Sequence, residues 1–230
     1  MKRPIPGGFL LAVEGVDGAG KSVQVESVSR VLKTRGLDCV VTREPTGGHW
    51  GKLARESAST GRLSPREELK AFIEDRKEHV RDLIRPSLEA GKVVITDRYY
   101  FSTVAYQGAR GFDPQELLRM NEHFAVEPHL LVIIDLEPEA SLARIGHRDG
   151  MGDEFETLAQ LAKSREIFQS LEKPYLMRID GRLRPDDIRD EILVAMSRSL
   201  VERIAKSPEL RAAQKLEAIL TWHGVENPEE

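Results

Sequence analysis

Apolar and polar residues alternate along this chain with two periods, one typical of buried strands and one typical of amphipathic helices. Five short apolar runs predict strands, at residues 9–14, 38–43, 92–97, 130–136 and 175–180. The stretches between them repeat apolar residues every three or four positions, as helices with one buried face do. Strands that alternate with helices are typical of a parallel sheet with crossover helices. We therefore expect an α/β protein with a five-stranded parallel sheet flanked by helices in three layers.

The helical pattern is clearest in residues 65–90, where apolar residues repeat along one face. Further helices are expected at residues 22–32, 114–124, 139–145, 154–172, 185–201 and 207–222. We expect one main domain over residues 1–204, and an additional helix and tail over residues 205–230. An apolar helix face is suited both to burial within a monomer and to a dimer interface, so this pattern leaves the assembly open.

The first apolar run leads directly into a glycine-rich segment. Residues 15–22 read GVDGAGKS, which fits the phosphate-loop pattern G-x-x-x-x-G-K-[S/T]. Strand, glycine-rich turn and helix follow one another here in the order that such a loop requires, which disfavours a plain glycine turn. The glycines let backbone N–H groups approach phosphates, Lys21 supplies a positive charge, and the Ser22 hydroxyl can ligate Mg²⁺. The segment therefore predicts a site for a nucleoside triphosphate.

The composition limits the setting of this site. Of the 230 residues, 40% are hydrophobic and 31% are charged, which is ordinary for a soluble globular protein. No apolar run approaches the roughly 18 residues of a membrane-spanning helix, and the first residues lack the pattern of a signal peptide. We expect a cytoplasmic protein with no membrane partner. The net charge of −4 gives no general attraction to nucleic acid, and Cys39 is the only cysteine, so no internal disulfide forms.

Two charged segments follow predicted strands. Asp97-Arg98-Tyr99 comes after the third apolar run, and Arg43-Glu44-Pro45 comes at the end of the second. Carboxyl ends of parallel strands face the ligand crevice, so these residues are placed where phosphates gather. Asp97 can orient Mg²⁺ or its waters, and Arg98 can grip phosphate oxygens as a fork. The alternative for Asp97 and Arg98 is a pair that caps the next helix.

Phe72 and Arg76 lie four residues apart in the long helical segment, so they share one face. An aromatic ring beside a fixed guanidinium is suited to stacking on a flat base while bonding its polar edge. Taken alone, however, the pair favours Phe72 as ordinary core and Arg76 as a solvated surface charge, because periodic apolar residues are usually core.

Taken together, these segments resemble the bacterial type of the thymidylate kinase family, whose members phosphorylate dTMP with ATP. The resemblance is carried by EGVDGAGKS at 14–22, REP at 43–45, FIEDR at 72–76 and DRYYFSTVAYQG at 97–108. A weaker likeness continues to about residue 200. The resemblance implies a P-loop kinase fold with a mobile lid, Mg²⁺ bound with ATP, and a homodimer.

The resemblance also implies a role for each matching residue. The implied ATP-binding residues are Gly15, Val16, Asp17, Gly18, Ala19, Gly20, Lys21, Ser22 and Arg144. The implied dTMP-binding residues are Asp17, Arg43, Phe72, Arg76, Arg98, Tyr106 and Gln107. The implied catalytic residues are Lys21, Arg98, Arg148 and Asp17, and the implied metal ligands are Ser22 and Asp97. Asp17 is expected to reach the 3′-hydroxyl of the acceptor sugar, Phe72 to stack on thymine and Arg76 to bond the base edge. Glu14 aligns with a family glutamate beside the phosphates.

Two stretches depart from the family pattern or leave it open. The phosphate loop carries no arginine at its variable positions, which resembles the bacterial pattern in which a mobile lid supplies the cation. The candidate lid is residues 144–153, with Arg148 as the preferred catalytic cation and Arg144 facing ATP. This stretch has fewer arginines than many bacterial relatives, and a plain surface loop is the alternative. After Arg-Glu-Pro, residues 46–50 read TGGHW where the family often has Gly-Gly-Thr.

Three functions stay open on the sequence. The first is a dTMP kinase, which Phe72, Arg76 and Tyr106 favour. The second is a related P-loop kinase that acts on another nucleotide or small metabolite. The third is a non-catalytic nucleotide-binding switch, and the lack of an N-K-x-D run disfavours its GTPase-like form. One methyl group separates dTMP from dUMP, and it is worth only about 1–3 kcal/mol, so spacing does not decide between these two acceptors.

Overall fold

The computed structural model describes residues 4–60, 63–149 and 158–224 of the chain, and side chains at 58–60 and 145–149 are outside the description. Within these residues a single five-stranded sheet runs in the order β2-β3-β1-β4-β5, with every neighbouring pair parallel. The strands are β1 Phe9–Glu14, β2 Cys39–Arg43, β3 Val93–Asp97, β4 Leu130–Asp135 and β5 Leu176–Asp180. Each lies within one residue of an apolar run, so the predicted five-stranded parallel sheet is confirmed.

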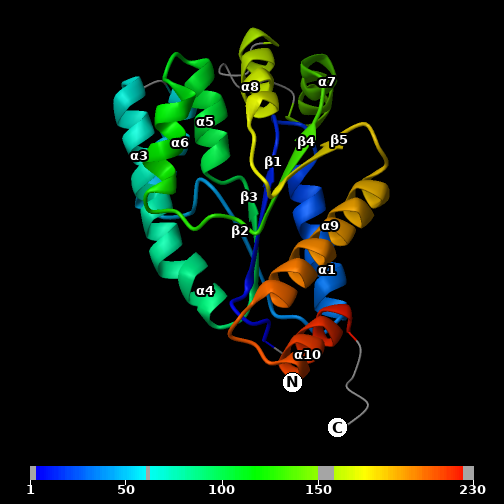
Figure 1. Cartoon of the computed structure of the whole chain (residues 1–230). Helices are drawn as coiled ribbons and strands as arrows, with labels where there is room; N and C mark the ends of the chain where they lie inside the picture. The colour runs from blue at the N-terminus through cyan, green and yellow to red at the C-terminus, as the bar shows by residue number, and fades with distance from the viewer. Residues whose placement is uncertain (1–3, 61–62, 150–157, 225–230) are drawn as a thin grey trace.

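Helices cover both faces of this sheet and give three layers (Figure 1). The helices are α1 Lys21–Thr34, α2 His49–Thr60, α3 Pro65–His79, α4 Arg85–Glu89, α5 Tyr100–Ala109, α6 Pro114–Glu122, α7 Pro138–Asp149, α8 Leu158–Ser170, α9 Pro185–Lys206 and α10 Ala212–His223. α1 and α9 pack together in one layer, and α3, α5, α6 and α8 form the opposite one. β1 lies at the centre and is buried along its whole length, which explains why its sequence is a continuous apolar run.

The sequence pattern predicted one helix over residues 65–90, and the structure divides this segment. α3 begins with a capping box between Ser64 and Glu67 and ends at His79. A π-helical turn, Val80–Ile84, follows, and α4 then starts at Arg85 with Pro86 in its first turn. Because proline has no backbone N–H, it cannot continue the α-helical hydrogen-bond ladder at this point. The wider π-helical turn accommodates this proline. The segment predicted as one helix therefore consists of three consecutive helical pieces.

Two helices were not predicted. α5 reads YFSTVAYQGA, in which aromatic and β-branched residues are frequent, and such residues favour strands over helices. α2 begins His49-Trp50-Gly51, and a glycine in the first turn weakens the helical signal. Both helices follow strands at their carboxyl ends, where the charged segments of the sequence also lie.

The helix expected over residues 207–222 is present as α10 and packs on α9. Its Trp222 side chain is fully buried, with its ring 5.6 Å from that of Phe9 at the start of β1. The indole Nε1–H donates a hydrogen bond of 2.9 Å to the Ser197 hydroxyl on α9. α10 therefore closes the amino end of the sheet, away from the carboxyl ends of the strands (Figure 1).

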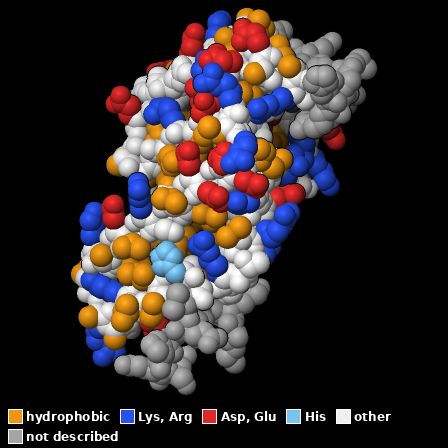
Figure 2. All heavy atoms as spheres, turned by 90° about the vertical axis from the view of Figure 1, so that its right-hand side faces the viewer, with side chains coloured by type: hydrophobic (Ala, Val, Ile, Leu, Met, Phe, Trp, Pro, Cys, Tyr) orange, Lys and Arg blue, Asp and Glu red, His pale blue; other side chains and the backbone are white. Residues whose placement is uncertain are grey.

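The outer side of α9 and α10 is shown in Figure 2, where basic and acidic side chains are interspersed. Exposed apolar residues on these helices include Val194 and Leu216. In the described residues, no helix combines the length and the hydropathy that crossing a bilayer requires.

Candidate functional site

The phosphate-loop segment joins β1 to α1 as a tight turn. Three of its residues, Gly15, Gly18 and Gly20, have positive φ angles of 139°, 77° and 96°. A Cβ atom at Gly15 would lie 2.4 Å from the carbonyl oxygen of Ile134 on β4, so only glycine fits there. Gly20 is the N-cap of α1, and backbone N–H groups at a helix N-terminus bind anions. The strand, turn and helix that the motif requires are therefore present.

Lys21 at the start of α1 folds back over this loop. Its side chain is buried, and its Nζ donates hydrogen bonds to the carbonyl oxygens of Gly15 at 3.0 Å and Val16 at 2.8 Å. Nζ also lies 3.8 Å from the Asp17 carboxylate. Burial lowers the pKa of Lys21, and the nearby Arg98 guanidinium acts in the same direction, while Asp17 opposes both. An arriving phosphate would offer this ammonium group a stronger partner than the carbonyls it now contacts.

Arg98 lies beside the loop, immediately after β3. Its guanidinium pairs with the Asp17 carboxylate through Nη2, and Nη1 donates a hydrogen bond of 3.0 Å to the Ser102 hydroxyl. The guanidinium also lies over the Tyr106 ring, 5.1 Å from its centre. Burial acts to lower the pKa of Arg98, but the Asp17 carboxylate and other acidic neighbours outweigh it, so its pKa lies well above the ordinary value. Arg98 is a fixed cation next to the phosphate loop.

Asp17 and Tyr106 complete this cluster. The Tyr106 hydroxyl donates to the Asp17 carboxylate at 3.1 Å and accepts from the Asp17 backbone N–H at 3.1 Å. The Ser141 hydroxyl on α7 donates to the Asp17 carbonyl oxygen. The structure thus brings Asp17, Lys21, Arg98 and Tyr106 together from the phosphate loop, α1, the turn after β3 and α5.

Ser22 and Asp97 form a second pair at the same edge of the sheet. The Ser22 hydroxyl donates a 2.5 Å hydrogen bond to Asp97 Oδ2. Hydroxyl and carboxylate oxygens are ligands that Mg²⁺ accepts, and this ion usually takes its other ligands from water and phosphate. The described residues contain no cluster of three or more His, Cys, Asp or Glu side chains that could hold a metal ion alone. The pair therefore fits a Mg²⁺ that arrives with a nucleotide.

Glu14, the last residue of β1, is fully buried beneath this cluster. Burial raises the pKa of its carboxyl to about 7, while the hydrogen bond from Ser102 and the charge of Arg98 oppose that rise. The carboxylate accepts the backbone N–H groups of Tyr99 at 2.7 Å and Ser102 at 3.0 Å, and the Ser102 hydroxyl at 2.6 Å. Ser102 was not singled out from the sequence, although it lies within the DRYYFSTVAYQG run.

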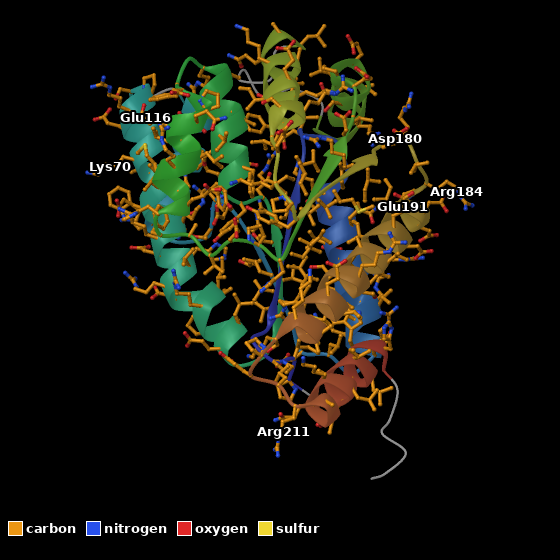
Figure 3. The ribbon with its side chains drawn as sticks, viewed as in Figure 1. Lys70, Glu116, Asp180, Arg184, Glu191 and Arg211 are labelled. Atoms are coloured by element: carbon orange, nitrogen blue, oxygen red, sulfur yellow. The ribbon has the colours of Figure 1, made fainter. Side chains whose placement is uncertain are left out.

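Arg76 is deeply buried, which excludes the solvated surface charge that the pattern alone favoured. Lys70, on the same helix α3, points outward (Figure 3), whereas the Arg76 side chain is 2% exposed. Its Nε donates to Glu44 Oε2 at 2.8 Å, Nη1 donates to Asn121 Oδ1 at 2.5 Å, and Nη2 donates to Thr103 Oγ1 at 3.0 Å. Its carboxylate partner is 32 residues away in the chain, so the sequence pattern could not indicate that the charge is buried as an ion pair.

Glu44 is in turn held by a histidine. Burial acts to raise the pKa of Glu44, but the charge of Arg76 and the hydrogen bond with His79 outweigh it and lower the pKa. Because an ionised carboxylate only accepts, His79 Nδ1 donates to Glu44 Oε1 at 2.9 Å, and its Nε2 is hydrogen-bonded with the Thr42 hydroxyl at 2.8 Å. None of these partners was given a role from the sequence: Thr42, His79 and Asn121 lie outside the quoted motifs, and Thr103 lies within the DRYYFSTVAYQG run without being singled out.

The other predicted acceptor residues occupy separate places. Phe72 is half-buried on α3, and Arg43 is exposed at the end of β2. Gln107 is buried, and its Nε2 donates to Glu68 Oε1 at 3.1 Å. These three side chains therefore do not join the Asp17–Arg98 cluster directly, and their predicted roles at a bound nucleotide stay predictions.

The candidate lid is described only in part. α7 runs to Asp149, so residues 144–149 are helical. Arg144 Nη2 donates to the Gly181 carbonyl at 3.0 Å and Nη1 donates to the Gly18 carbonyl at 3.4 Å, which joins α7 to the phosphate loop. The side chain of Arg148 and residues 150–153 lie outside the described residues.

The TGGHW stretch, which departs from the family pattern, is anchored to α3. The Thr46 backbone N–H and hydroxyl donate to Asp75 at 2.8 Å and 2.5 Å. The rings of His49 and Trp50 lie 5.3 Å apart, and Lys70 Nζ lies 6.0 Å from the Trp50 ring. The stretch is thus a fixed turn that leads into α2.

Comparison with known proteins agrees with this geometry. The family model for thymidylate kinase matches residues 13–192. A thymidylate kinase of Akkermansia muciniphila is 44% identical over 190 residues, which is 83% of this chain and 92% of that protein. A thymidylate kinase of Xylella fastidiosa is 45% identical over 184 residues, 80% of this chain and 84% of that protein. One from Xanthomonas campestris is 42% identical over 199 residues, 86% of this chain and 87% of that protein. The chain belongs to the thymidylate kinase family.

Proposed function

We propose that this chain transfers the γ-phosphoryl group of ATP to dTMP, giving ADP and dTDP. The observation that carries the proposal is the position of Arg98 beside the phosphate loop, where it shares the Asp17 carboxylate with Lys21. A phosphate loop alone serves any nucleoside triphosphate. A second fixed cation at the same place is suited to a second anion, such as the phosphate of an acceptor nucleotide.

In this reaction an oxygen of the dTMP phosphate bonds to the γ-phosphorus, and the bond from that phosphorus to the β–γ bridging oxygen breaks. The attacking oxygen is already a competent nucleophile, so alignment and charge neutralisation dominate the catalysis. Lys21 and the loop amides would hold the β- and γ-phosphates, and Arg98 would neutralise the acceptor phosphate. The Asp17 carboxylate would give up its ion pair with Arg98 when the acceptor phosphate binds. It would then contact the 3′-hydroxyl of the acceptor sugar.

Mg²⁺ would be held by Ser22 and Asp97, and when bound it neutralises charge on the β- and γ-phosphates. The hydrogen bond between Ser22 and Asp97 holds their side-chain oxygens close together before the metal ion binds. On the far side of the acceptor, Phe72 would stack on thymine and Arg76 would bond the base edge. The ion pair with Glu44 supports the latter role, because it fixes the guanidinium in one orientation.

Four further assignments belong to the proposal. Arg43 would contact the acceptor phosphate from β2, and Tyr106 and Gln107 would line the acceptor pocket from α5. Arg144 would face the ATP phosphates from α7, which its contact with the Gly18 carbonyl supports. Arg148 would supply the catalytic cation from the lid: Arg148→Ala is expected to lower kcat, and an unchanged kcat would contradict the lid assignment.

The protein is proposed to act as a homodimer in the cytoplasm, with ATP and dTMP as its partners. Sedimentation equilibrium checks the assembly, since a dimer has twice the chain mass of 25.9 kDa. A species of single chain mass at micromolar concentration would contradict the dimer.

The activity is tested with a coupled assay of ADP release across dTMP, dUMP, dCMP, dGMP and AMP. We expect the highest kcat/KM with dTMP, and no release without Mg²⁺. Equal turnover of all acceptors would favour the related P-loop kinase of broader substrate range. ATP binding without turnover of any acceptor would favour a nucleotide-binding switch.

A further inference from the structure

The turn that presents Arg98 is strained and firmly held. Among the residues that the structure describes, Arg98 is the one non-glycine residue with a positive φ angle, 70°. Such a conformation persists only where the surroundings fix it. Here the Arg98 N–H donates to the Val13 carbonyl at 3.0 Å, and the Thr96 hydroxyl donates to the Arg98 carbonyl at 2.7 Å. The next N–H, that of Tyr99, donates to the Glu14 carboxylate at 2.7 Å.

The same carboxylate also determines how the Arg98 side chain is held. A guanidinium only donates hydrogen bonds, so the Ser102 hydroxyl must accept from Arg98 Nη1. The single proton of that hydroxyl then needs another acceptor, and Glu14 Oε2 lies 2.6 Å away. The hydrogen bonds of Glu14 go to Ser102 and to the Tyr99 N–H, so Glu14 holds Arg98 through these groups, in addition to the direct attraction between the two charges.

The two ends of the guanidinium thus have different partners. Nη1 is tied inward to Ser102, and Nη2 reaches outward to Asp17 and lies 3.5 Å from the Tyr106 hydroxyl. An acceptor phosphate could replace Asp17 at Nη2 while Nη1 keeps its bond to Ser102. The hydrogen bond from Nη1 to Ser102 would then keep the guanidinium in one orientation while the phosphate replaces Asp17.

We propose that Glu14 and Ser102 are positioning residues that fix Arg98, through the Ser102 hydroxyl and the Tyr99 N–H, so that Nη2 is presented to the acceptor phosphate. The inference rests on the proposed role of Arg98 in binding that phosphate. The fully buried carboxylate of Glu14 would thus serve to position Arg98 for the acceptor, a role that binding of ATP or of the metal ion does not require.

A double-mutant cycle tests it. We compare kcat/KM for dTMP in wild type, Ser102→Ala, Arg98→Ala and the double variant, at about pH 8, above the pKa of about 7 that burial gives Glu14. Ser102→Ala is expected to lower kcat/KM by about fivefold through a higher KM for dTMP, with the KM for ATP unchanged. In the Arg98→Ala background the same substitution is expected to have no effect. An equal loss in both backgrounds would overturn the positioning role.

Two more variants separate the positioning role from a structural one. Ser102→Thr keeps the hydroxyl and is expected to retain most of the wild-type value. Glu14→Gln keeps an oxygen for the backbone N–H groups but offers a donor to Ser102, so it is expected to match Ser102→Ala and to add nothing in the Arg98→Ala background. A wild-type value for Glu14→Gln would overturn the role of Glu14.

Ser197→Ala is the matched control, because its hydroxyl contacts Trp222 at the opposite end of the sheet. It is expected to lower the melting temperature without changing kcat/KM for dTMP. A loss of kcat/KM equal to that of Ser102→Ala would show that loss of any half-buried serine hydrogen bond has this effect, and would overturn the inference. If Arg98→Ala itself leaves dTMP turnover intact, the proposed function of Arg98 fails, which is a different result from equal losses in both backgrounds.

Discussion

The two ends of β1 differ in the side chains that surround them, which are charged at one end and mainly aromatic at the other. At its carboxyl end Glu14, Lys21 and Arg98 are charged groups with little or no exposure, held by hydrogen bonds to Ser102 and to the phosphate loop. At its amino end Phe9 stacks against the His129 ring at 5.2 Å and lies 5.6 Å from Trp222. Six residues of one strand thus connect a polar network with an aromatic cluster.

This difference separates function from stability. Taking charges out of water is costly, and their mutual attraction repays the loss only in part, so the carboxyl end contributes little net stability. Apolar burial at the amino end is favourable without such a penalty. We expect substitutions at the carboxyl end to change rates and substitutions at the amino end to change the free energy of unfolding.

The largest effect is expected for Arg98→Ala. Removing a cation that neutralises charge in phosphoryl transfer is expected to lower kcat/KM for dTMP by about 10³-fold, measured on the folded protein. The matched control is Arg203→Ala at the amino end, whose guanidinium donates to the Gly8 carbonyl at 2.5 Å. It is expected to leave the kinetics unchanged. Similar kinetic losses in both variants would break the division between the two ends.

Trp222→Ala is expected to act in the opposite way. Truncating a fully buried tryptophan is expected to lower the free energy of unfolding by about 3–5 kcal/mol, measured by urea denaturation. The activity of the folded protein at 25 °C should be retained. Trp222→Phe keeps an aromatic ring but loses the hydrogen bond to Ser197, so a smaller loss of about 1 kcal/mol is expected beyond the change in packing. A strong loss of activity with unchanged stability would contradict a purely structural α10.

The amino end should also respond to pH. Burial lowers the pKa of His129 to about 4, and the nearby Arg203 acts in the same direction. Between the unfolded value near 6.5 and this value the unfolded chain binds more protons, so the stability that neutral His129 provides is lost as pH falls through that window. The loss across the whole window is on the order of 3 kcal/mol. Denaturation at several pH values should show it in wild type and not in His129→Gln. Identical pH profiles would contradict the shift.

The sequence predicts correctly those elements whose pattern lies within one continuous stretch of residues. The five strands are continuous apolar runs, and the phosphate loop is a contiguous motif between a strand and a helix, so both were visible. Helix α5 was missed because its aromatic and β-branched residues pack inward against the sheet, where packing overrides propensity.

The parts of the site that depend on distant partners could not be predicted. Arg76 was ambiguous because burial of its charge depends on Glu44, Thr103 and Asn121, which lie on three other segments. The Ser102 hydroxyl gains its importance from Glu14, 88 residues earlier in the chain. Hydrogen bonds of this kind are decided by the topology of the sheet, and a single sequence carries no periodic signal for them.

The smallest effect sharpens the comparison within the carboxyl end. Arg144 bridges the Gly18 and Gly181 carbonyls beside the phosphate loop, whereas Arg184 is exposed and pairs with Asp187 on the first turn of α9 (Figure 3). A hydrogen bond from a charged group to the loop is worth about 1 kcal/mol, so Arg144→Ala is expected to raise the KM for ATP by about three- to tenfold without changing the KM for dTMP. Arg184→Ala is expected to leave both KM values unchanged, because an exposed ion pair contributes little. An equal rise in the KM for ATP in both variants would contradict this prediction. It would mean that ATP is attracted by the general positive charge around the site and that the hydrogen bonds of Arg144 have no part in binding it.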